Sequence, residues 1–268
     1  QLDLTSSDSI AAALDRHHPW AVINAAGWVR VDEAEGSETA CLDANAHGAI
    51  RLAQTCQARD IATVGFSSDL VFDGALDRPH VESDPVAPLN GYGRSKALAE
   101  AGIMGLGGRH LMVRTAAFFS PYDPHNFAAH VMRTLAADQT LEAADDLVVS
   151  PTYVPDLVDA VLDLAIDGET GLWHLANSGA VTWAEFAVKI AVALNLDPSL
   201  VRPVPSARFG WPAVRPARAA LTSERGLTLP SLDNAIGRHA AVITAAAFVG
   251  DAEAQVDQHV PSNTFGRV

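Results

Sequence analysis

The chain has 268 residues, of which 49% are hydrophobic and 19% charged, and its formal net charge is −14. These values predict a folded protein with one large domain, or with a main domain and a small appendage. Its 18 Lys and Arg residues are scattered, which excludes a nucleic-acid-binding protein because such binding needs clustered cations, whereas an anionic nucleotide substrate requires only a few local donors.

The predicted elements alternate between strand and helix over about the first two thirds of the chain. In chain order we expect a strand at residues 2–4, a helix at 5–17, a strand at 21–24, a helix at 38–59, a strand at 61–67, a helix at 92–103, a strand at 110–114, helices at 126–137 and 154–166, a strand at 172–176 and a helix at 182–194. A capping box formed by Thr182 and Glu185 is predicted to begin the last of these helices.

This alternation indicates an α/β protein with a Rossmann-like, doubly wound parallel sheet. After about residue 195 five prolines interrupt the pattern, so we expect a small C-terminal lobe on the substrate side of the sheet. Within a single domain spanning 1–268, residues 1–150 would form the dinucleotide-binding core, and 151–249 mainly the lobe with some core elements. Residues 250–268 would form a frayed tail.

Cys41 and Cys56 both fall in the predicted helix at 38–59. Fifteen residues of helix separate them by about 22 Å, which is too far for a disulfide. Two buried, reduced thiols fit a cytoplasmic protein. Neither a signal peptide nor an apolar run of membrane-spanning length is visible, since the apolar stretch at 240–249 is too short. We therefore expect no membrane partner.

The strongest chemical signal is Tyr92-Gly93-Arg94-Ser95-Lys96, a YxxxK pair. Residues i and i+4 share one face of a helix, so the phenol and the ammonium would point the same way. A nearby cation favours the phenolate and is expected to lower the pKa of Tyr92. Such a tyrosine can exchange a proton with a carbonyl or alcohol oxygen.

The setting of this pair makes it more specific. Ser67 and Ser68 lie at the end of a predicted buried strand, and Ser68 precedes Tyr92 by 24 residues. Ligands of open α/β sheets lie outside the carboxyl ends of the strands. A hydroxyl there and a YxxxK pair at the start of the next helix are typical of hydride transfer to a carbonyl group.

Here the sequence resembles the extended short-chain dehydrogenases/reductases, and most of all the dTDP-4-dehydrorhamnose reductase family. The segments that carry the resemblance are AVINAAG, VDEAE, DANAHGAIRLAQTC, SSDLVFDG, PLNGYGRSK, VRTAAFF, HNFAAHVM, SPTYVPDLVDA and WHLANSGAVTWAEFA, and they cover roughly residues 1–235. Their order along the chain makes the resemblance far more specific than any single motif.

The resemblance implies a role for each matching position. Ser68, where the family has a threonine, Tyr92 and Lys96 would be catalytic, and Asn45 matches the family's helix asparagine. The cofactor, NADPH or NADH, would contact Asp3, Leu4, Asn24, Ala25, Ala26, Ser67, Tyr92 and Lys96. The sugar-nucleotide substrate would contact Ser68, Asp69, Asn126 and Arg215. Arg114 is a weaker site candidate.

Two positions depart from the family pattern. Leu70 replaces a tyrosine after the aspartate, and Ala116 and Ala117 stand where an aromatic residue is expected. Both positions lie near the substrate sugar in the family. The resemblance therefore implies reduction of a 4-keto deoxysugar nucleotide and leaves the particular sugar open.

The sequence shows no glycine-rich turn between a first strand and a first helix, the unit that normally holds the cofactor pyrophosphate. We therefore expect that roughly 50 residues of the family's fold, a βαβ unit and part of the next helix, are missing. The chain would be part of a longer polypeptide or associate with a missing N-terminal segment, or form a homodimer. The glycines from 102 to 108 follow a helix and precede a strand, so they predict a C-cap and a loop.

Two other functions stay open. One is a non-catalytic regulatory or binding subunit with the same fold, and the other is a related sugar-nucleotide epimerase or dehydratase. Ser68, Tyr92 and Lys96 favour the reductase, and Asp69 has no adjacent glutamate of the kind a dehydratase uses. No His, Cys, Asp or Glu spacing predicts a metal site.

Overall fold

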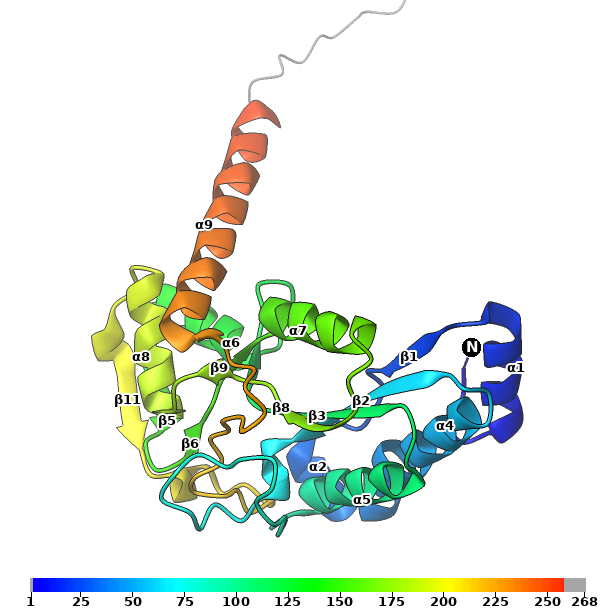
Figure 1. Ribbon diagram of the computed structural model, residues 1–268. Helices are drawn as coiled ribbons and strands as arrows, with labels where there is room; N and C mark the ends of the chain where they lie inside the picture. Colours follow the sequence, from blue (N-terminus) through cyan, green and yellow to red (C-terminus); the bar gives the residue numbers. More distant parts are fainter. Residues whose placement is uncertain (1, 258–268) are drawn as a thin grey trace, which may run out of the picture.

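A four-stranded parallel sheet lies at the centre of the computed structural model, which describes residues 2–257 and their side chains as far as residue 245. The order of the strands is β1-β2-β3-β8 (Figure 1). They are β1 (Ala21–Asn24), β2 (Ala62–Ser68), β3 (His110–Thr115) and β8 (Gly171–His174). Every pairing is parallel, so these four predicted strands and the predicted fold class are confirmed.

The strand predicted at residues 2–4 is wrong. The Asp3 carboxylate accepts hydrogen bonds from the Thr5 backbone N–H and hydroxyl, both at 2.8 Å. A side chain that bonds two residues ahead in its own backbone favours a turn over a strand. Helix α1 (Ser7–His17) follows, and the Ser6 side chain caps its N-terminus.

Helices cover the two faces of the sheet unequally. Helices α2 (Val31–Gly36), α4 (Gly48–Gln57) and α5 (Gly91–Leu106) lie on one side, and α7 (Val154–Ile166) lies on the other (Figure 1). Leu157 and Val161 of α7 pack on Val64, Leu111 and Val113 of β2 and β3. The helix predicted at 154–166 is therefore confirmed, and its apolar side packs on the sheet core.

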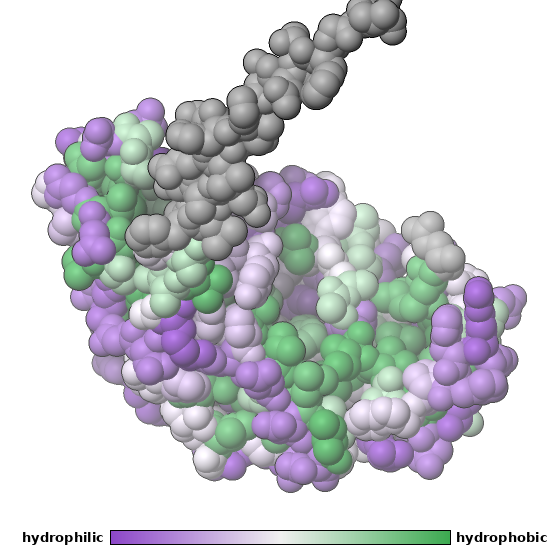
Figure 2. Space-filling view, turned by 90° about the horizontal axis from the view of Figure 1, so that it is seen from above, coloured by the Kyte–Doolittle hydropathy of each residue, from purple (hydrophilic) through white to green (hydrophobic). Residues whose placement is uncertain are grey.

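Hydrophobic surface remains on the face that carries α7 (Figure 2). The exposed apolar side chains include Val158, Leu162 and Ile166 on α7 and Ile23 on β1, the edge strand of the described sheet. None of the described helices is both long and apolar enough to cross a membrane.

The helix predicted at 38–59 contains a distortion that the sequence did not indicate. It consists of α3 (Glu38–Leu42), a π-helical turn η1 (Asp43–His47) and α4. Such π turns insert an extra residue into the helix and often mark functional sites. Cys41 and Cys56 are buried and free, as expected from their separation along this helix.

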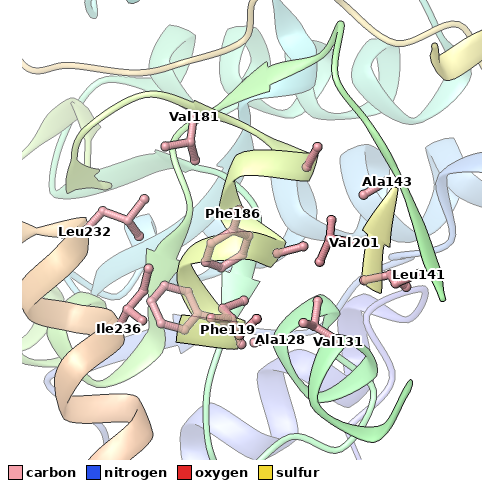
Figure 3. Packing of buried hydrophobic residues seen from close by; sticks show 14 of the residues in the cluster. Phe119, Ala128, Val131, Leu141, Ala143, Val181, Phe186, Val201, Leu232 and Ile236 are labelled. Carbon is pink, nitrogen blue, oxygen red and sulfur yellow. The ribbon is translucent and has the colours of Figure 1, made fainter. Parts of the chain in front are cut away.

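The C-terminal lobe is built from three helices and short strand pairs. Helices α6 (Phe127–Ala136), α8 (Trp183–Ala193) and α9 (Leu232–Asp257) surround a core with Phe119 and Phe186 at its centre (Figure 3). The capping box of Thr182 and Glu185 is present. The strand pairs are β4 (Phe118–Phe119) with β7 (Thr152–Tyr153), β5 (Leu141–Ala144) with β11 (Val201–Val204), β6 (Val148–Val149) with β10 (Val181–Thr182), and β9 (Asn177–Ser178) with β12 (Leu229–Ser231).

Helix α9 was not predicted from the sequence, and it includes residues 250–257 of the predicted tail. The rest of that predicted tail, residues 258–268, lies outside the described residues. The N-terminal half of α9 is anchored to the lobe by Leu232, Ala235 and Ile236, and Arg238 forms a bidentate pair with the buried Asp156. Its alanine-rich sequence carries little contrast between faces, which is why periodicity did not reveal it.

Candidate active site

A cavity of about 630 Å³ lies between the carboxyl end of β2 and the C-terminal lobe. We call it the main cavity. It occupies the place where open α/β sheets bind their ligands. Its lining comprises Val31, Ser68, Asp69, Leu70, Tyr92, Ala117, His125, Phe127, His130, Glu142, Ala143, Ala144, Leu147, Val149, Trp183, Phe209, Trp211, Arg215, Pro216 and Ala219. Four of the predicted site residues therefore share one cavity: Ser68, Asp69, Tyr92 and Arg215.

The turn after β2 places Ser68 and Asp69 in the wall of the main cavity. Ser68 ends the strand and caps the short 3-10 helix η2 (Asp69–Val71), because its Oγ accepts the Leu70 N–H at 3.1 Å. The same hydroxyl donates to the Asp69 carboxylate at 2.8 Å. Both residues are buried, so their geometry is fixed by the turn.

The first turn of α5 holds Tyr92 against η2. Asn90 caps this helix by accepting the Gly93 N–H at 2.7 Å, and its amide donates to the Val214 carbonyl at 2.8 Å. At Gly93 a Cβ would overlap the Leu70 carbonyl oxygen, so only glycine permits this close approach. Ser68 and Tyr92 line the same cavity, and hydrogen bonding with the Ser68 hydroxyl lowers the pKa of Tyr92.

The net pKa shift of Tyr92 is nevertheless upward, and the expectation that Lys96 lowers it is wrong. Burial raises the pKa most, followed by the charge of Asp69, and these effects outweigh the contact with Ser68. The Lys96 ammonium lies 5.6 Å from the centre of the phenol ring and donates to the Phe66 carbonyl at 3.0 Å. A phenol with a raised pKa stays protonated near neutral pH, which is the state a proton donor needs.

Lys96 is a buried ammonium with spare donors. Its bond to Phe66 uses one of three N–H groups, and burial lowers its pKa to about 8. A Cβ at Gly27 would lie 2.6 Å from the Asn45 Oδ1 and 3.8 Å from the Lys96 Nζ. The absence of a side chain at Gly27 therefore keeps the approach to Lys96 open.

Asn45 fixes the backbone beside Gly27. Its side chain accepts the Trp28 N–H at 2.7 Å and donates to the Trp28 carbonyl at 3.1 Å and to the Ser95 hydroxyl at 3.0 Å. The π turn at Asp43–His47 contains this asparagine. One side chain thus joins the helix after β1 to α5, the helix that carries Tyr92 and Lys96.

A second cavity of about 380 Å³, the N-terminal cavity, is lined by Asp3, Leu4, Thr5, Ala26, Gly27, Trp28, Val29, Arg30, Asp43 and Ala44. Of the predicted cofactor contacts, Asp3, Leu4 and Ala26 line it. Asn24 and Ala25 do not, and Asn24 instead accepts the Ala26 N–H at 3.1 Å. The Ser67 hydroxyl is buried, has no partner among the described residues and lines neither cavity.

Two further candidates, Asn126 and Arg114, form structural contacts and line neither cavity. Asn126 caps α6, with Oδ1 accepting the Ala129 N–H and Nδ2 donating to the Ser120 and Asp123 carbonyls. These bonds engage both ends of its amide, and Asn126 is not part of the main cavity lining, so its role as a substrate ligand stays a prediction. Arg114 is buried in a bidentate pair with Glu100 at 2.7 and 2.8 Å, away from either cavity lining.

Beside the predicted Arg215, the main cavity lining contains Phe209 and Trp211, which sequence reasoning missed. Phe209 and Trp211 stack with ring centroids 4.5 Å apart, and the Arg215 guanidinium lies 4.2 Å from the Trp211 ring. Asp32 binds Arg215 at 2.7 and 2.9 Å. The prolines and aromatics at 203–216 were the signal for Phe209 and Trp211, whereas the family resemblance pointed to Arg215. Among the described residues, no three His, Cys, Asp or Glu side chains are placed to hold a metal.

Comparison with known proteins gives consistent matches. The family model described as RmlD substrate binding domain matches residues 1–233. The chain is 37% identical to a dTDP-4-keto-6-deoxy-D-glucose reductase of Streptomyces niveus, over 85% of the chain and 80% of that protein. It is 34% identical to a dTDP-4-dehydrorhamnose reductase of Streptomyces griseus, over 84% and 75%. The crystal structure of a dTDP-4-dehydrorhamnose reductase from Bacillus anthracis in complex with NADP superposes with a TM-score of 0.85 at 30% identity, covering 89% of this chain and 86% of that one.

Proposed function

The chain belongs to the RmlD substrate binding domain family, and from this premise we propose that it is an oxidoreductase that reduces the 4-keto group of a dTDP-linked 6-deoxy sugar with NADPH. The names of its relatives give the reaction class, and the complex of a similar reductase with NADP supports the choice of cofactor. The single observation that carries the proposal is the presence of Ser68 and Tyr92 in the wall of one cavity, with Lys96 behind Tyr92.

The hydroxyl groups of Tyr92 and Ser68 have different roles at the carbonyl oxygen of the substrate. Tyr92, whose pKa is raised by burial, gives its proton to the oxygen as negative charge develops there. Ser68 hydrogen-bonds the same oxygen and orients the carbonyl group. Asp69 and Leu70 border this position.

The residues around Gly27 suit a dinucleotide. The spare donors of Lys96 would hold ribose hydroxyl groups, and the N-terminal cavity with Asp3, Leu4 and Ala26 would take the adenosine side. NADPH, when bound, supplies the hydride.

The lining of the main cavity suits a deoxysugar nucleotide. Its apolar lining includes Leu70, Ala117 and Ala144, which would contact the methyl group of the sugar. The stacked Phe209 and Trp211 would form an apolar wall beside the nucleotide. The N–H groups of Arg215 that Asp32 does not bind would donate to phosphate oxygens. On this proposal both parts of the chain serve the substrate, because Leu70 and Ala117 precede residue 150 and Arg215 follows it.

Two further points belong to the proposal. The free edge of β1 supports pairing with a strand from a second copy or from another polypeptide segment. The two buried free thiols support a reducing, cytoplasmic location.

Steady-state oxidation of NADPH tests the proposal. With dTDP-4-keto-6-deoxyglucose or its epimer as substrate, absorbance at the nicotinamide band should fall in a 1:1 ratio to sugar reduced. Turnover should be absent without the keto sugar. A protein that binds both the sugar nucleotide and NADPH and oxidises no NADPH would instead support the regulatory-subunit alternative.

A further inference from the structure

Asp69 is a buried acid that the proposed reaction does not yet use. It begins η2, lines the main cavity and is 6% exposed. No described residue forms an ion pair with it, and its one side-chain partner is the Ser68 hydroxyl at 2.8 Å. A buried carboxylate without a cation is unfavourable, so such a group prefers to hold a proton. Buried acids of this kind are concentrated at functional sites.

Ser68 connects this acid to Tyr92. Its Oγ accepts the Leu70 N–H and donates to the Asp69 carboxylate, and Ser68 lines the main cavity together with Tyr92. A serine has one hydrogen to donate. When Asp69 is ionised, that hydrogen goes to the carboxylate and is withheld from Tyr92. When Asp69 is protonated, the acid can donate to Ser68, and Ser68 can donate onward.

We propose that Asp69 returns a proton to Tyr92 through Ser68 after each turnover, which rests on the proposed reductase function. Tyr92 loses its hydrogen to the substrate oxygen and becomes a phenolate. The Ser68 O–H bond then breaks as a new O–H bond forms on Tyr92, and the Asp69 O–H bond breaks as one forms on Ser68. Asp69 is left as a carboxylate and takes a proton from solvent through the mouth of the cavity. One proton passes from solvent to Tyr92, and no electrons move.

The pKa values of the two end groups favour this direction. Burial raises the pKa of Asp69 to about 7, and burial also raises the pKa of Tyr92 above its ordinary value. A proton therefore moves downhill from the carboxyl group to the phenolate. Near neutral pH about half of the Asp69 carboxyl groups carry a proton, so the relay can be reloaded from solvent.

No other charged group on the surrounding elements takes this role. On α5, the Lys96 ammonium donates a hydrogen bond to the Phe66 carbonyl. Across the main cavity Arg215 is paired with Asp32. The remaining titratable groups of the lining are Glu142, which pairs with Arg208, and the exposed His125 and His130. Asp69 is the acid in direct contact with Ser68, so the relay begins there.

Turnover measured from about pH 5 to about pH 9 tests the relay. In the unaltered protein, kcat should fall about tenfold per pH unit above about pH 7, because ionised Asp69 supplies no proton and holds the Ser68 hydrogen. Asp69→Asn should lower kcat on the order of tenfold at low pH and abolish this fall. A residue with a purely structural role would scale the whole curve and leave its shape. Asp163→Asn, an equal change of charge at an exposed position on α7, is the matched control and should leave the profile unchanged.

Carbon-13 NMR of aspartate carboxyl groups gives a second readout that does not depend on activity. One resonance should titrate near pH 7 and disappear in Asp69→Asn. Ser68→Ala should move its midpoint upward, because the hydrogen bond from Ser68 lowers the pKa of Asp69. An Asp69 resonance that titrates below pH 5, or an active Asp69→Asn variant that keeps the alkaline fall in kcat, would overturn the relay. An unaltered protein that oxidises no NADPH would overturn the proposed function, whereas the NMR titration would still report on Asp69.

Discussion

Replacing Gly93 by alanine tests how α5 positions Tyr92. A Cβ at this position would overlap the Leu70 carbonyl oxygen, and it would lie 3.0 Å from both the Leu70 carbonyl carbon and the Pro88 Cβ. Two of these three atoms belong to the backbone, so no side chain can rotate to make room. The strain must be relieved by moving α5 away from η2. Because Ser68 and Asp69 adjoin η2 and Tyr92 adjoins Gly93, this movement separates the reacting groups.

The expected effects follow from that separation. A displacement on the order of 1 Å in reacting groups lowers the rate about 10²-fold, so kcat should fall by that factor. Overpacking of this kind lowers the free energy of unfolding by about 1–3 kcal/mol. Turnover would be measured by NADPH oxidation at saturating substrate, and stability by urea unfolding.

Gly105→Ala is the matched control on the same helix. Nothing lies within 4 Å of a Cβ at Gly105, and alanine is favoured over glycine in a helix by about 1 kcal/mol. This variant should be slightly more stable and equally active. A Gly93→Ala protein with unchanged kcat and unchanged unfolding midpoint would refute the argument that the contact of α5 with η2 sets the position of Tyr92.

Four other predictions can be checked with the same protein. Tyr92→Phe should lower kcat about 10²- to 10⁴-fold with little change in substrate affinity, because only the proton donor is lost; unchanged turnover would contradict its assignment. Lys96→Met should weaken NADPH binding about 10- to 100-fold in calorimetric titration, as expected for charged hydrogen bonds. Arg114→Met should lower the free energy of unfolding by about 3–5 kcal/mol, because the Glu100 carboxylate is left buried without its partner, and an unchanged urea midpoint would argue against that pair. The folded-state pKa of Asp69 lies above its ordinary value, so its contribution to stability is present at low pH and is lost as pH rises through about 7; Asp69→Asn should remove this loss in unfolding experiments across that range.

The sequence predicted the elements with strong local signals. The four core strands and the helix at Val154–Ile166 have continuous or periodic apolar patterns, and the Thr182–Glu185 capping box marks a helix start directly. These signals act within a few residues. By contrast, the turn at Asp3 depends on one side-chain bond that competes with a strand, and such competition is not visible in hydrophobicity.

The candidate site was predictable where residue type and position at a strand end carry the chemistry. Ser68 and Tyr92 fall into one cavity as their motifs suggested. The role of Asn126 could not be predicted in the same way. The same amide group can cap a helix or bind a ligand, and the sequence does not distinguish these two roles. Arg215 was predicted from the family resemblance, but its contacts with Asp32 and Trp211 were not. The pair with Asp32 joins segments about 180 residues apart, and such a contact follows from tertiary packing alone.

The most direct test of the reductase function is transfer of deuterium from C4-deuterated NADPH to the sugar. We predict a product with one deuterium bound at C4 of the hexose for each NADPH consumed, and Tyr92→Phe should slow its formation in parallel with kcat. A sugar product without deuterium at C4, formed while NADPH remains unconsumed, would identify an epimerase or dehydratase and contradict the reductase.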